Sequence, residues 1–105
     1  FPAQLVAAVE LPRFFDDLGC LSTFLRAGRA PAGATAFVAD HRSRAWVRAD
    51  RAVYTRVPGL ATPMGSRVVA HADAASRDLD PLARGGAPVA ARELLGDFAS
   101  PEGDR

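Results

Sequence analysis

The chain has 105 residues, of which 49% are hydrophobic, and this is enough for one domain around a single hydrophobic core. Its formal net charge is only +1 and no basic cluster is interleaved with aromatic residues, so a nucleic-acid-binding surface is not expected. Because the chain holds one cysteine, Cys20, an intrachain disulfide and a closed zinc site of several cysteines are excluded. All 13 basic residues are arginine, which is typical of a GC-rich bacterial coding bias.

Nothing in the sequence has the length of a membrane-spanning helix, because no run approaches about 18 apolar residues. No signal peptide is visible, and the chain begins with Phe1 in place of methionine. We therefore expect the sequence to start inside a longer or processed protein, so that its first residues do not encode its compartment.

The first part of the chain predicts a strand, a helix and a second strand. Residues 3–10 form a short apolar run, long enough for a strand and closed by Pro12. Residues 16–27 carry apolar side chains at helical spacing. Asp16 or Asp17 is placed to cap this helix, and Gly28 ends it. Residues 34–40 have the pattern of a buried strand.

The second part predicts further strands and another helix. Residues 45–57 are rich in β-branched and aromatic side chains and predict one or two strands, whereas residues 58–65 form a loop rich in proline and glycine. A strand is expected over residues 66–72 and a helix over 74–83, with Asp73 as its cap. Residues 88–95 fit a final strand or a short helix.

This order of elements predicts an α+β fold with a small mixed sheet and two helices. We expect a single domain over residues 1–99, followed by a polar, flexible tail over residues 100–105. The order also suggests two similar halves.

The chemistry of the side chains favours a soft metal over catalysis. No standard catalytic motif is present, so an enzyme is not expected. Cu(I) prefers thiolate, thioether and imidazole ligands, which Cys20, Met64, His41 and His71 supply. Cys20 and His71 also fit buried core positions, and His41 fits a solvated turn. The one methionine is different, because it lies between a proline and a glycine in a predicted loop.

Three segments occur in the order seen in NosL-like proteins, which the chain resembles over residues 3–73. They read FFDDLGCLSTFLRAG from Phe14, AFVADHRSRAWVRADRAVYTRV from Ala36 and TPMGSRVVAHAD from Thr62. NosL-like proteins are accessory copper chaperones associated with nitrous oxide reductase. The resemblance implies two related β-β-α-β units, a Cu(I) site with sulfur ligands, and an extracytoplasmic, periplasmic lipoprotein that delivers copper to its client.

The resemblance assigns roles to particular residues. Met64 is the first expected ligand and Cys20 the second, while His71 is a candidate on its chemistry alone. Members of the family usually carry a cysteine-containing segment before the first strand, and this sequence begins without one. Missing ligands would come from such a segment or from the client protein. Hard carboxylates suit Cu(I) poorly, so the remaining positions of the motif are expected to support the shape of the site: Asp17, Asp40, Pro63 and Gly65.

We expect a monomer that contacts a client copper protein such as nitrous oxide reductase, and that meets a membrane only through an upstream lipid anchor. Two other classes of function stay open. A metal-free binding or assembly module would keep the same fold without copper. An enzyme similar to organomercury lyase would need several activated thiols, and the chain has one.

Overall fold

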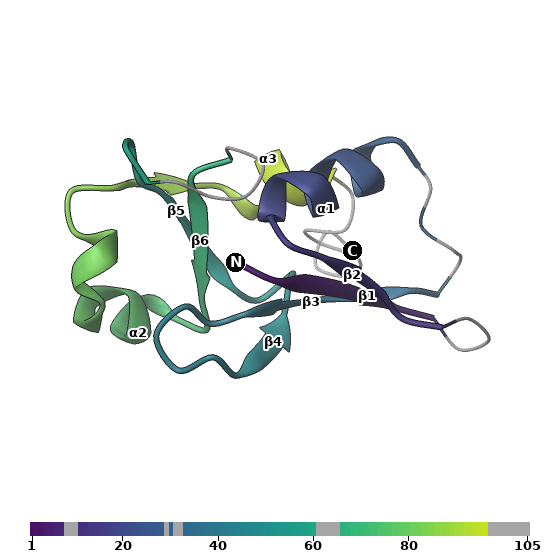
Figure 1. Ribbon diagram of the computed structural model, residues 1–105, viewed down its shortest axis with the longest axis horizontal. Helices are drawn as coiled ribbons and strands as arrows, with labels where there is room; N and C mark the ends of the chain where they lie inside the picture. Colours follow the sequence, from purple (N-terminus) through teal and green to yellow (C-terminus); the bar gives the residue numbers. More distant parts are fainter. Residues whose placement is uncertain (8–10, 29, 31–32, 61–65, 97–105) are drawn as a thin grey trace.

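The chain folds into two antiparallel sheets and three α-helices, as seen in a computed structural model that describes residues 1–7, 11–28, 30, 33–60 and 66–96 (Figure 1). None of the helices within these ranges is long and apolar enough to cross a membrane. The sequence-based prediction of an α+β fold is confirmed at this level.

The first sheet has four strands in the order β2-β1-β3-β4, and every neighbouring pair is antiparallel. Its register sets Ala3 opposite both Phe15 and Val38. Helix α1 covers this sheet and contacts β1, β2, β6 and α3. The elements are β1 (Ala3–Val6), β2 (Arg13–Phe15), α1 (Leu18–Arg26), β3 (Thr35–Ala39) and β4 (Trp46–Arg48).

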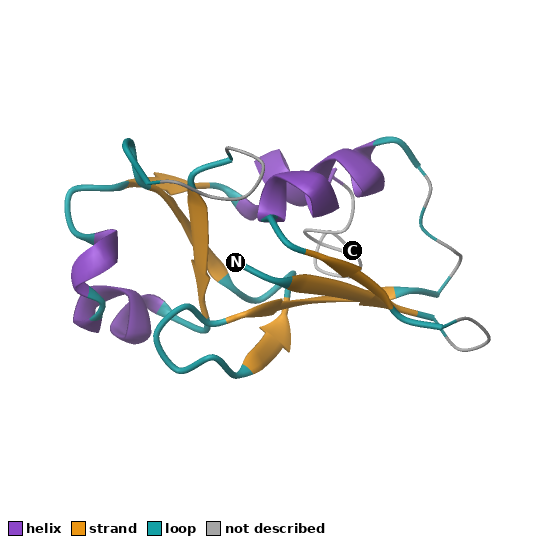
Figure 2. Ribbon diagram, viewed as in Figure 1, coloured by secondary structure: helices purple, strands orange, loops and turns teal. Residues whose placement is uncertain are grey.

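The second sheet has three strands in the order β6-β5-β7, again antiparallel, and α2 packs against β6 (Figure 2). The predicted helix over residues 74–83 is divided into α2 and a short 3-10 helix, η1, that starts at Pro81, because proline cannot donate the next helical hydrogen bond. The elements are β5 (Val53–Arg56), β6 (Val68–His71), α2 (Ala74–Leu79), η1 (Pro81–Ala83), β7 (Ala87–Val89) and α3 (Ala91–Leu95).

The prediction of one small mixed sheet with two helices is wrong in detail. After α1, strand β3 pairs with β1 and not with β2, so the two strands that flank the helix in the sequence lie on opposite sides of β1. All neighbours are then antiparallel. Residues 45–57 supply two strands, β4 and β5, that belong to different sheets, and residues 87–95 supply a strand and also a third helix.

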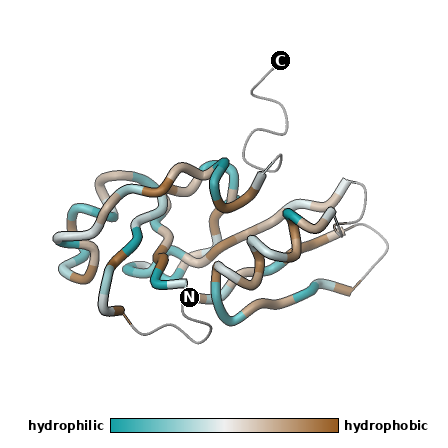
Figure 3. The backbone as a smooth tube through the Cα atoms, turned by 90° about the horizontal axis from the view of Figure 1, so that it is seen from above, coloured by the Kyte–Doolittle hydropathy of each residue, from teal (hydrophilic) through white to brown (hydrophobic). Residues whose placement is uncertain are grey.

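The core is formed where α1 and α3 meet the two sheets. Leu18, Leu21 and Leu25 are buried on one face of α1, at the helical spacing that the sequence shows. Hydrophobic and hydrophilic segments are interspersed along the described chain (Figure 3), and all four residues of β6 are buried. The predicted polar tail, residues 100–105, lies outside the described residues.

Hydrogen bonds join the turn after β3 to the end of β6 and so connect the two sheets. The backbone N–H of His41 donates to the carbonyl of Ala70 at 2.8 Å. The backbone N–H of Ala72 donates to the carboxylate of Asp40 at 2.7 Å. This connection brings the polar side chains of the turn beside those that follow β6.

Candidate metal centres

The start of α1 is held by Asp17, which is fully buried. Its Oδ1 atom accepts a hydrogen bond from the backbone N–H of Gly19 at 2.6 Å, which makes Asp17 the N-cap of the helix. Its Oδ2 atom accepts a longer hydrogen bond, 3.4 Å, from the backbone N–H of Ser66. One carboxylate therefore links the first turn of α1 to the segment that leads into β6.

Gly19 lets these two segments approach closely. A Cβ atom placed on Gly19 would lie 2.9 Å from the Cβ of Ser66, which is too close for two carbon atoms. Cys20 is the next residue of the helix and is half-buried. The expected ligand Met64 and its neighbours Pro63 and Gly65 lie outside the described residues.

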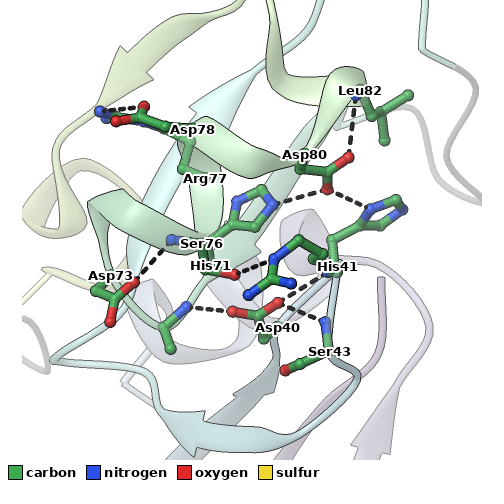
Figure 4. Close-up of polar contacts among 12 residues, drawn as sticks. Asp40, His41, Ser43, His71, Asp73, Ser76, Arg77, Asp78, Asp80 and Leu82 are labelled. Carbon is green, nitrogen blue, oxygen red and sulfur yellow. Dashed lines mark hydrogen bonds and ion pairs between the residues drawn. The ribbon is translucent and has the colours of Figure 1, made fainter.

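Asp40 organises the turn after β3 and is almost fully buried. Its Oδ1 atom accepts from the backbone N–H groups of Arg42 at 2.8 Å and Ser43 at 2.9 Å, and its Oδ2 atom accepts from Ala72 (Figure 4). Burial raises the pKa of Asp40, but these donors and the hydroxyl of Ser76 outweigh it, so the pKa lies well below its ordinary value. Asp40 is thus a structural carboxylate whose oxygen atoms are occupied by hydrogen bonds.

His71, the last residue of β6, is brought together with His41 and Asp80 (Figure 4). The Oδ2 atom of Asp80 lies 2.8 Å from Nε2 of His71 and 3.0 Å from Nδ1 of His41. These three atoms all lie within 4.8 Å of one another. We call these residues the His41–His71–Asp80 cluster.

The cluster is buried at one end and open at the other. The side chain of His71 is completely buried and that of Asp80 is 9% exposed, whereas that of His41 is 31% exposed. The ring of His41 stacks on Phe1 and borders a pocket of about 290 Å³, whose wall also includes Leu18 at the start of α1. Solvent therefore reaches the cluster from the side of His41.

Asp80 is oriented by the backbone as well as by the two imidazoles. It follows α2, and its Oδ1 atom accepts from the backbone N–H of Leu82 at 3.0 Å, which caps η1. Burial raises the pKa of Asp80, but the hydrogen bonds from His71, His41 and Leu82 outweigh it and lower the pKa, so the carboxyl group is ionised at neutral pH. The cluster therefore presents two imidazoles around one fixed negative charge.

The sequence identifies His71 as a candidate ligand but does not reveal its partners. The expectation that His41 is solvated, because it lies in a polar turn, is incomplete: its ring contacts Asp80 and Phe1. Sequence reasoning misses Asp80 altogether. Its one local signal is that it directly precedes Pro81, which marks a cap, and no spacing pattern joins positions 41, 71 and 80.

Comparison with protein-family models finds no match. No curated protein and no solved structure matches the chain either.

Proposed function

We propose that this chain is a copper chaperone domain that holds Cu(I) between the start of α1 and the predicted loop that precedes Ser66. The observation that supports this proposal best is the contact of Ser66 with Gly19 and Asp17, directly beside Cys20. Ser66 follows Met64 by two residues in the sequence. The thiolate of Cys20 and the thioether of Met64 are the soft ligands that Cu(I) prefers.

A site with so few ligands suits delivery. A chaperone has to release its ion, and two sulfur ligands leave a coordination position free for a ligand of the client protein. Cys20 is partly exposed, so a client can approach the ion without unfolding α1. In this proposal Asp17 and Asp40 bind no copper, because their oxygen atoms accept backbone hydrogen bonds that hold the neighbouring segments in place.

The topology is consistent with a NosL-like fold, which belongs to the same proposal. In each sheet the first strand of a unit lies between the second and third strands of that unit: β2-β1-β3 and β6-β5-β7. Each unit places a helix, α1 or α2, between its second and third strands in the sequence. Two related β-β-α-β units would have this arrangement. The proposed client is an extracytoplasmic copper enzyme such as nitrous oxide reductase, and the proposed location is the periplasm or cell envelope.

A metal-free protein-binding module is the second candidate, and the edge strand β2 favours it. Phe14 on this strand is 67% exposed, and Leu11 just before it is 88% exposed. Within the described residues, β2 has a sheet neighbour on one side only. Exposed apolar side chains along an open edge are a common feature of protein-binding surfaces. This surface also suits the client of a chaperone, so copper binding is the property that separates the two candidates.

An anaerobic Cu(I) titration against a chromophoric chelator tests the proposal. We expect one Cu(I) per chain, and we expect Cys20→Ser and Met64→Ala each to weaken binding at least about 100-fold, since loss of even an outer partner of a metal ligand costs roughly 10–100-fold. Thr23→Ser is the matched control, because it is a conservative change on the same helix that leaves both ligands intact. Its affinity for Cu(I) should equal that of the wild type.

The outcomes separate the two candidates. A wild-type chain that fails to compete for Cu(I) would leave the metal-free module as the better account. If the wild-type chain competes for Cu(I), but neither Cys20→Ser nor Met64→Ala changes the affinity, then copper binds elsewhere in the molecule.

A further inference from the structure

The His41–His71–Asp80 cluster has the ligands of a second metal site, distinct from the sulfur site proposed above. Two imidazole nitrogens and one carboxylate oxygen are a borderline-to-hard ligand set, which suits Zn²⁺, Ni²⁺ or Cu²⁺ better than Cu(I). We propose that this cluster binds one divalent first-row transition-metal ion.

The distances within the cluster allow an ion to enter with little rearrangement. Ligand atoms about 2.1 Å from a tetrahedral ion lie roughly 3.4 Å from one another. The contacts of Asp80 Oδ2 measure 2.8 Å to His71 and 3.0 Å to His41. Each of them needs to lengthen by about 0.6 Å or less to reach the tetrahedral spacing. The two imidazole nitrogens lie within 4.8 Å of each other. They need to approach by at most about 1.4 Å to reach the same spacing.

The ring of His71 is buried and presents its Nε2 atom to the cluster. The Nδ1 atom of its ring is buried and has no hydrogen-bond partner among the described residues. An unsatisfied buried polar atom costs about 1–3 kcal/mol, whereas a phenyl ring would fill a similar volume without this cost. What the imidazole adds at this position is its Nε2 atom, which faces Asp80.

The negative charge of the cluster and its exposure to solvent at His41 also suit a cation. Asp80 is the one carboxylate in the cluster; its Oδ1 atom accepts from Leu82, and its Oδ2 atom faces both imidazole rings. Metal binding requires neutral imidazoles, and with them the carboxylate gives the site a net negative charge. His41 is the solvent-facing member, and an ion and one or two waters can reach it from the exposed side.

The two proposed ions require different ligands, so the two sites can be tested independently. The test uses a tag-free chain carrying Cys20→Ser and Met64→Leu, which removes the sulfur ligands, and Co²⁺ as the spectroscopic probe with Zn²⁺ as its competitor. We expect one Co²⁺ per chain, with visible absorption bands that Zn²⁺ abolishes. In this background His71→Phe, His41→Phe and Asp80→Asn are each expected to weaken binding at least about 100-fold.

Asp73→Asn is the matched control, because Asp73 caps α2 through Ser76 but lies outside the cluster. Its affinity for Co²⁺ is expected to equal that of the parent. Far-ultraviolet circular dichroism identifies any variant that fails to fold, and the folded ones then decide the result. Equal Co²⁺ affinity in the folded cluster variants and in the parent would overturn the proposal.

A second measurement on the same tag-free parent needs no substitution within the cluster. The chain has two histidines, so ¹⁵N-histidine labelling gives the signals of two rings and no others. We expect one equivalent of Zn²⁺ to shift the ring nitrogens of both residues together. If Zn²⁺ leaves both rings unchanged, or shifts that of His41 alone, the three-ligand site does not exist.

Discussion

Asp17 is the residue on which the proposed copper site most depends without binding the ion itself. Its carboxylate joins Gly19 to Ser66 through two backbone hydrogen bonds, and it is fully buried. A buried carboxylate in this position has two effects: it begins the helix that carries Cys20, and it holds Ser66, two residues after Met64 in the sequence.

We therefore predict that Asp17→Ala lowers the free energy of unfolding by about 2 kcal/mol, the upper range for loss of an N-cap, because the N–H groups of Gly19 and Ser66 lose their acceptor. Urea denaturation measures this change. Asp16→Ala is the control, since Asp16 is adjacent but exposed, and it should change stability by less than about 0.5 kcal/mol. Equal effects of the two substitutions would contradict this role of Asp17.

The lowered pKa of Asp40 predicts that the stability of the fold depends on pH. Its pKa in the folded chain lies below the ordinary value of 3.8, so its contribution to stability is fully present above that value and is lost as the pH falls through the lower, folded pKa. Asp40→Asn should cost about 2 kcal/mol at neutral pH, since hydrogen bonds to a charged acceptor are lost.

Urea denaturation between about pH 6 and about pH 3 tests the direction of this dependence. The difference in the free energy of unfolding between wild type and Asp40→Asn is expected to shrink as the pH falls. Asp78→Asn is a suitable control, because the side chain of Asp78 is 68% exposed. A gap that stays constant, or widens toward low pH, would show that the charge of Asp40 does not stabilise the fold.

At the scale of elements, the packing of α1 against Ser66 is the feature that needs a glycine. Alanine in place of Gly19 would favour the helix by up to about 1 kcal/mol, but its Cβ would meet the Cβ of Ser66 at 2.9 Å. Neither atom is the end of a flexible side chain, so one of the two segments must move.

We predict that Gly19→Ala weakens Cu(I) binding by separating Cys20 from the segment that carries Met64. The double variant with Ser66→Gly should recover most of the affinity, because it removes one of the two clashing atoms. A double-mutant cycle of Cu(I) affinity measures this coupling. Strict additivity of the two substitutions would argue that the contact between Gly19 and Ser66 has no part in copper binding.

Most of the elements are predictable from the sequence, because they have a local signal, but strand β2 (Arg13–Phe15) is not among the predicted elements. The leucines of α1 recur at helical spacing, and Asp17 and Asp73 stand at the caps that the structure shows. The pairing of strands is not predictable in this way. Nothing local indicates that β3 lies beside β1, or that the short segment 49–52 separates two strands of different sheets.

At the scale of the whole molecule, the docking of the turn after β3 on the end of β6 brings the His41–His71–Asp80 cluster together. Side-chain chemistry alone indicates both histidines as candidate ligands, whereas Asp80 acquires its significance only through this docking. That docking depends on hydrogen bonds between residues some thirty positions apart, and sequence spacing does not report it.

The two proposed metal sites share no ligand. The pocket beside His41 is also lined by Leu18, the first residue of α1, so these two residues face a common space. In these proposals the chain offers sulfur ligands for a soft ion at one place and imidazoles with a carboxylate for a harder ion at the other.

The measurement that tests the central claim most directly uses the single methionine of the chain. In tag-free protein labelled with ¹³C at the methionine methyl group, Met64 gives one methyl signal. We predict that one equivalent of Cu(I), added without oxygen, shifts this signal fully, and that Cys20→Ser removes or greatly weakens the shift. If the protein binds Cu(I) and the Met64 methyl signal stays where it was, copper is not held between α1 and the segment that carries Met64.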